Sequence, residues 1–169
     1  MELRLRAHPL WESRVPDWPA AAVAGLAAGA LVMVVELLWV TWVMGVSPWI
    51  GPRMIAAMLL GPGVLEPASF DVAVIAVSLF VHFLLGSVLA ILFALVAVPL
   101  RLDTNVFIVM AAGLLFGVVV YLVNIVGLSQ VFTWFAPTRG WATLGAHLLF
   151  GWCTGLMYWL LERRGTGMS

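Results

Sequence analysis

The sequence predicts an all-α membrane fold, a four-helix transmembrane bundle. Its 169 residues are 64% hydrophobic and only 9% charged, with a mean hydropathy of +1.12, whereas soluble domains contain about 25% charged residues. Four long apolar stretches are each able to span a bilayer, which takes about 20 residues. Segments rich in proline, glycine and charge separate them.

The charges give nucleic-acid binding no support. Eight acidic residues balance eight basic ones, all of them Arg, and the arginines are scattered singly or in pairs rather than gathered in a patch. The single cysteine, Cys153, lies in an apolar run. One cysteine cannot form an internal disulfide, so Cys153 is interpreted as a small core residue.

The four spans are predicted in order along the chain. An N-terminal segment, residues 1–17, has no signal-peptide core and is expected to be disordered or to lie on the membrane surface. The second span starts at Asp71, with Ser69 as an alternative cap, and a tight hairpin joins it to the third. The spans are residues 19–45, 71–98, 105–128 and 141–161, within one domain at 18–164 that is followed by a tail at 165–169.

Two connections are longer than the hairpin. Residues 46–70 hold four prolines around an apolar piece, Arg53–Leu60, which is predicted to be a short interfacial helix in the first outer loop. Residues 129–140 are rich in aromatic side chains, with Pro137 and Gly140 as turn signals.

The arginines predict the orientation. The N-terminus, the hairpin and the C-terminus share one side of a four-span bundle and carry six arginines, whereas the other side has only Arg53 and Arg139. By the positive-inside rule, both termini are predicted to be cytoplasmic. Trp18, Tyr158 and Trp159 would then form an inner aromatic belt. The six arginines are Arg4, Arg6, Arg14, Arg101, Arg163 and Arg164, and the outer belt is Trp39, Trp42, Trp49, Trp134 and Trp141.

Each predicted span holds one strongly polar residue in its outer half. Counted from the outer ends at about 1.5 Å per residue, the four lie roughly 6–17 Å deep. Each is in helical phase with a stripe of small residues, the usual contact face between membrane helices. We therefore expect one buried polar cluster: Glu36, His82, Asn124 and His147. The packing glycines are Gly25, Gly29, Gly86, Gly113, Gly117, Gly151 and Gly155.

Four uses of this cluster remain open. The groups satisfy one another by hydrogen bonds, or Glu36, His82 and His147 hold a metal such as zinc or non-haem iron, with nearby methionines favouring copper. In a third use, His82 and His147 are axial haem ligands. The fourth is proton or small-solute handling by a Glu–His pair. A metal or haem is not expected by default.

Glycine-rich membrane motifs carry a resemblance to a known group. They are Ala24-Gly25, Ala28-Gly29, Met58-Leu59-Leu60-Gly61, His82 with Gly86, and the run from Leu144 to Tyr158. Over residues 20–160 the chain resembles uncharacterised four-helix prokaryotic inner-membrane proteins akin to the YagU-like group. The resemblance implies a location in the bacterial inner membrane and a histidine near the start of the second and fourth helices. Glu36 and the extra Ala146 before His147 depart from the group's pattern.

The function expected from the sequence is non-catalytic. No serine lies in a nucleophile motif, and no glycine-rich phosphate loop follows a strand. We expect a small accessory or structural subunit of a larger membrane complex, with an electron-transfer complex as one candidate host. The expected partners are the lipid bilayer and other membrane subunits. The alternative is a metal-binding, haem-binding or proton-handling protein that uses Glu36, His82 and His147.

Overall fold

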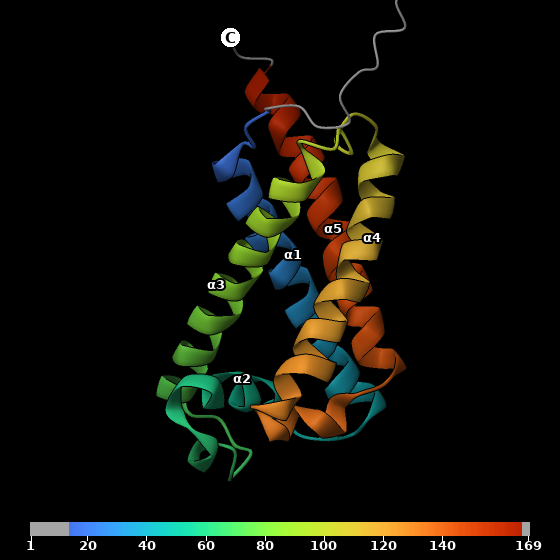
Figure 1. Ribbon diagram of the computed structural model, residues 1–169. Helices are drawn as coiled ribbons and strands as arrows, with labels where there is room; N and C mark the ends of the chain where they lie inside the picture. Colours follow the sequence, from blue (N-terminus) through green and yellow to red (C-terminus); the bar gives the residue numbers. More distant parts are fainter. Residues whose placement is uncertain (1–13, 167–169) are drawn as a thin grey trace, which may run out of the picture.

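The chain folds into a helical bundle with four helices of membrane-spanning length (Figure 1). The computed structural model describes residues 14–166, with side chains to Glu162. Within this part of the chain there is no strand, so the all-α prediction is confirmed. Four helices this long and apolar make the chain a multi-pass membrane protein in contact with the lipid bilayer. The predicted features at residues 1–13, including Arg4 and Arg6, lie outside the described residues.

The four spans match the predicted ones to within a few residues. The first, Trp18–Val43, is α1 (Trp18–Leu38) and a π-helical end, Trp39–Val43. The second is α3 (Val72–Ala97). The third, Val106–Gln130, is α4 (Val106–Tyr121), a π-helical segment Leu122–Gly127 and the 3₁₀ turn Leu128–Gln130. The fourth lies in α5 (Trp141–Thr166), which runs past the predicted domain boundary at residue 164.

The connections contain shorter helices. The apolar piece of the first loop is α2 (Ile50–Leu60), followed by a 3₁₀ turn at Pro62–Val64. A second 3₁₀ segment, Thr133–Thr138, lies between α4 and α5. The helix in the first loop is therefore present, and its place at the membrane interface stays a prediction.

Side-chain caps start three of the spans. Asp71 accepts hydrogen bonds from the backbone N–H groups of Ala73 and Val74, which confirms it as the cap of α3. Asp17 caps α1, and Asn105 caps α4. Each cap satisfies N–H groups that have no partner within the helix, and this determines where each helix begins.

The helices pack in the order α3, α1, α5, α4. The contacts of α1 are with α3 on one side and α5 on the other, and α5 in turn packs against α4. By contrast, α3 and α4 meet mainly near the hairpin that joins them, where Phe93 lies against Phe116 with ring centroids 5.4 Å apart. Toward α2 these two helices diverge (Figure 1). We call this side of the bundle the α3–α4 side.

The core between α1 and α5 is built from small residues and one tyrosine. Ala21 and Ala24 are fully buried against Tyr158, whose side chain is itself inaccessible. The Tyr158 hydroxyl accepts a hydrogen bond of 3.2 Å from the backbone N–H of Asp17. The predicted role of Tyr158 in an inner aromatic belt is therefore wrong, because it packs inside the bundle. Cys153 is buried in a second cluster between α1 and α5, with Ala28 and Phe150, as predicted.

Ionic contacts close the hairpin end of the bundle. Arg14 donates to Asp103 at 3.0 Å and lies 3.8 Å from Glu162 of α5. The start of α1, the α3–α4 hairpin and the end of α5 thus lie together, opposite α2 (Figure 1). Arg14 and Asp17 belong to the predicted N-terminal segment, and both contact the bundle.

Candidate functional site

Glycines bring α1 and α3 into backbone contact. A Cβ on Gly25 would overlap the carbonyl group of Gly86, and one on Gly86 would lie 3.0 Å from the carbonyl oxygen of Gly25. Only hydrogen fits at Gly25, and at Gly86 a methyl group would be tightly confined. One turn further along α1, the open position at Gly29 receives the imidazole of His82.

A second set of glycines joins α4 to α5. Gly113 and Gly151 face each other's backbone, and Gly117 lies against the carbonyl group of His147. Gly155 lies against the carbonyl group of Val109. All the glycines assigned to packing from their spacing thus lie at two helix contacts, α1–α3 and α4–α5.

The two histidines belong to different helix pairs. The Nε2 atom of His82 lies 3.0 Å from the carbonyl oxygen of Gly29 and donates to it across the α1–α3 contact. The Nδ1 atom of His147 lies 2.8 Å from the carbonyl oxygen of Thr143, one turn earlier in α5. The ring of His147 meets Tyr121 of α4 edge to face, with centroids 5.7 Å apart. Each imidazole therefore serves local helix packing.

Glu36 is half-buried in the last turns of α1, and its carboxylate has no hydrogen bond or ion pair with the described residues. Neither a hydrogen-bond donor nor a charged group of the described residues lies beside its carboxylate. The hydrogen bond expected from His82 or His147 is absent from the described part of the chain. A bare carboxylate within a membrane span is costly, and the contacts of the described residues leave the position of Glu36 unexplained.

Asn124 is also half-buried, and it lies in the π-helical segment after α4. It makes no side-chain hydrogen bond within the described residues. Because Gly117 is level with His147, Asn124 lies about two turns, or roughly 10 Å, beyond that histidine along α4.

The polar residues therefore lie at different depths rather than in one layer. Since His82 is level with Gly29, Glu36 lies about two turns, or roughly 10 Å, further along α1. The expectation of a shared depth differs from the structure because depths counted from predicted helix ends ignore how far each helix slides past its neighbour. Here that offset is determined by the glycine crossings.

The metal and haem hypotheses gain no support from this arrangement. Within residues 14–162, no three His, Cys, Asp or Glu side chains are close enough together to hold a metal ion. The glycines next to the histidines, Gly86 and Gly151, do not make room for a porphyrin, because the backbones of Gly25 and Gly113 already fill that space.

Arg53 is a buried charge that the sequence analysis missed. The topology prediction treated it as a loop charge, but it is 5% exposed and faces inward from α2. Its Nε donates to the carbonyl oxygen of Ser69 at 2.8 Å, and its Nη1 donates to that of Val64 at 2.6 Å. It therefore holds the loop between α2 and α3 closed. The signal that could have revealed it was its position one turn before Ala56 and Ala57, on the buried face of an amphipathic helix.

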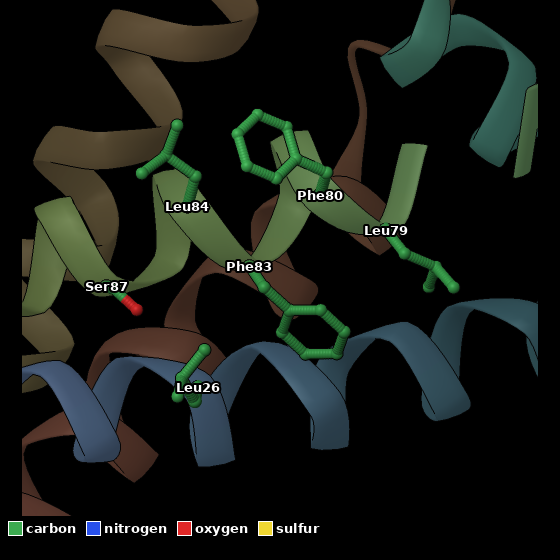
Figure 2. A pocket seen from close by; sticks show the side chains of 6 residues that line it. All are labelled: Leu26, Leu79, Phe80, Phe83, Leu84 and Ser87. Carbon is green, nitrogen blue, oxygen red and sulfur yellow. The ribbon is translucent and has the colours of Figure 1, made fainter. Parts of the chain in front are cut away.

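A shallow apolar hollow lies between α1 and α3 on the outer surface (Figure 2). Leu26 lines it from α1, and Phe83 of α3 points across it toward α1. Its one polar residue, Ser87, already donates to the carbonyl oxygen of Ala22 at 3.3 Å. This lining matches lipid acyl chains and provides no group for catalysis. The remaining lining residues are Leu79, Phe80 and Leu84.

Comparison with protein-family models, with curated proteins and with solved structures finds no match. The resemblance to the YagU-like group thus stays a prediction from the glycine motifs.

Proposed function

We propose that this protein is a non-catalytic subunit of a larger membrane assembly and that it binds its partner through the α3–α4 side. We place it in the bacterial inner membrane with both termini in the cytoplasm. The proposal rests on one observation, the unequal packing of the four helices. Glycines bring α1 and α3, and likewise α4 and α5, into backbone contact, whereas α3 and α4 separate beyond Phe93 and Phe116.

Apolar side chains follow both diverging helices. On α4, the face that begins with Phe116 continues through Val119 and Val123, which are 49% and 54% exposed. On α3, the face of Phe93 continues to Leu85, which is 39% exposed. A partner helix that packs along these rows would gain van der Waals contacts that α3 and α4 do not give each other.

The test is the state of the protein in membranes that contain its partners. We expect mild detergent or polymer extraction to give a discrete complex larger than the 18.3 kDa chain, seen by native mass spectrometry and cross-linking. Val119→Trp should weaken that complex. Leu114→Trp is the matched control, because Leu114 is exposed and lies five residues before Val119, on a different face of the same helix. A lone chain in every mild extraction would rule the proposal out.

A further inference from the structure

Glu36 lies on the face of α1 that packs against its two neighbours. It continues the row of Gly25, Gly29 and Val32 along α1. The glycines of this row face α3, whereas Val32 packs with Phe150 of α5. Glu36 therefore lies on the part of α1 that faces between α3 and α5. In the view of Figure 1, α1 is seen behind the region where α3 and α4 diverge.

The described chain cannot neutralise this carboxylate. Its arginines with described side chains, Arg14, Arg53, Arg101 and Arg139, all lie outside the four spans. The two histidines within the spans already donate to the carbonyl groups of Gly29 and Thr143. A second copy in the same orientation would bring the same residues at the same depths, so its described residues offer no arginine or lysine within a span.

Charge complementarity then identifies the missing group. We propose that Glu36 pairs with an arginine or lysine on a transmembrane helix of a different protein, which packs on the α3–α4 side. This inference rests on the proposed subunit function and names the chemistry of the partner. An ion pair in the membrane lowers the cost of both charges, and a guanidinium can donate two parallel hydrogen bonds to one carboxylate.

A synthetic helix can supply the missing cation. The full-length protein is reconstituted in phosphatidylcholine vesicles with a dansyl-labelled leucine-rich helix of about 21 residues. The helix carries one Arg placed about 10 Å from its end, to match the distance from Glu36 to the end of its span. A second helix has Gln in place of Arg. Energy transfer from the nine tryptophans of the protein reports binding.

We expect the Arg helix to bind about tenfold more tightly than the Gln helix. Glu36→Gln should remove this preference. Glu66→Gln should keep it, because Glu66 is an exposed acid in the loop after α2. Equal binding of the two helices by the wild-type protein, or an unchanged preference in Glu36→Gln, would overturn the inference.

Native extraction separates this inference from the subunit proposal. If wild-type and Glu36→Gln proteins both give the same complex and the Arg helix shows no preference, the subunit proposal stands and the charge pairing is wrong. If the wild-type protein is extracted only as a lone chain, the subunit proposal fails. A Glu36-dependent preference for the Arg helix would still support the pairing chemistry.

Discussion

Most polar side chains within the spans donate to a nearby backbone carbonyl. His82 donates to the carbonyl oxygen of Gly29 on the neighbouring helix, and His147 donates to that of Thr143 on its own helix. Ser87 donates to the carbonyl oxygen of Ala22 on α1. Such bonds remove the cost of a bare donor in hydrocarbon and add little beyond that. Glu36, Asn124 and Thr154 differ, because their side chains make no hydrogen bond with the described residues.

The hydroxyl of Thr154 predicts a stabilising substitution. Thr154 is fully buried, and its Oγ1 atom makes no hydrogen bond with any described residue. Thr154→Val keeps the shape and removes the unpaired polar atom, so we expect the free energy of unfolding to rise by about 1 kcal/mol. Thr143→Val is the matched control, because the hydroxyl of Thr143 donates to the carbonyl oxygen of Thr138 at 2.6 Å. In detergent, the thermal unfolding temperature should rise for Thr154→Val and fall for Thr143→Val.

Substitution of Arg53 is expected to loosen the loop between α2 and α3 without destabilising the whole fold. Lysine at this position keeps the charge but cannot reach the Val64 and Ser69 carbonyl groups with the same forked geometry. We expect Arg53→Lys to speed hydrogen exchange of the amides at residues 64–70 by about tenfold, with little change in global unfolding. Arg139→Lys is the control, since Arg139 contacts Ile125 and Ser129 instead. Unchanged exchange in the loop would show that Arg53 does not close it.

At the scale of the element, the sequence predicted where the helices lie better than how they pair. Hydropathy predicts the spans because length and composition alone decide whether a helix crosses a membrane. Phase placed Gly113 and Gly151 on contact faces, but it could not say that they face each other. Which stripes meet, and at what offset, depends on the packing of all four helices. For that reason Glu36 and His82, which were predicted to share one depth, lie at different depths.

The π-helical ends of the first and third spans were also not foreseen. Residues Trp39–Val43 and Leu122–Gly127 are apolar apart from Thr41 and Asn124, and neither stretch contains proline. No side chain in them distinguishes a π-helix from an α-helix, because the difference lies in which carbonyl each N–H selects. In both spans the polar residue lies at or just before the change in winding, Glu36 before the first and Asn124 within the second.

The α4–α5 contact is so close that one methyl group added at Gly151 should destabilise the fold. A Cβ on Gly151 would overlap the carbonyl group of Gly113 and lie 2.8 Å from the backbone nitrogen of Gly117. Because backbone atoms cannot move aside easily, we expect Gly151→Ala to lower the free energy of unfolding by about 1–3 kcal/mol.

Gly145→Ala is the matched control for this substitution. Gly145 lies in the same helix, and a Cβ there would meet nothing within 4 Å. Since alanine favours a helix over glycine, we expect no loss and a gain of up to about 1 kcal/mol. Equal destabilisation by the two variants would mean that the α4–α5 crossing is looser than the glycine contacts indicate.

At the scale of the whole molecule, the fold joins three chain segments at one end. Arg14, Asp103 and Glu162 come from the segment before α1, the α3–α4 hairpin and α5. This end also holds Arg101 in the hairpin, and Arg163 and Arg164 are in the last turns of α5. The opposite end has Arg53, which is turned inward, and Arg139. The inward turn of Arg53 leaves still less basic charge at the surface of that end.

This asymmetry predicts which end faces the cytoplasm. Positive charge near short loops is retained on the cytoplasmic side during insertion, so the hairpin end should be inside and the α2 end outside. Single cysteines at Thr104, in the hairpin, and at Gly63, in the loop after α2, report the two ends. Both positions are exposed, and a Cys153→Ala background removes the buried native thiol.

In intact cells, a membrane-impermeant maleimide should label Gly63→Cys at once and Thr104→Cys only after permeabilisation. The reverse pattern would place both termini outside and would mean that the arginines do not control insertion. It would also move Glu36 from the outer to the inner half of the membrane, because Glu36 is nearer the α2 end of α1. The depth at which a partner helix must carry its basic residue therefore follows from this labelling.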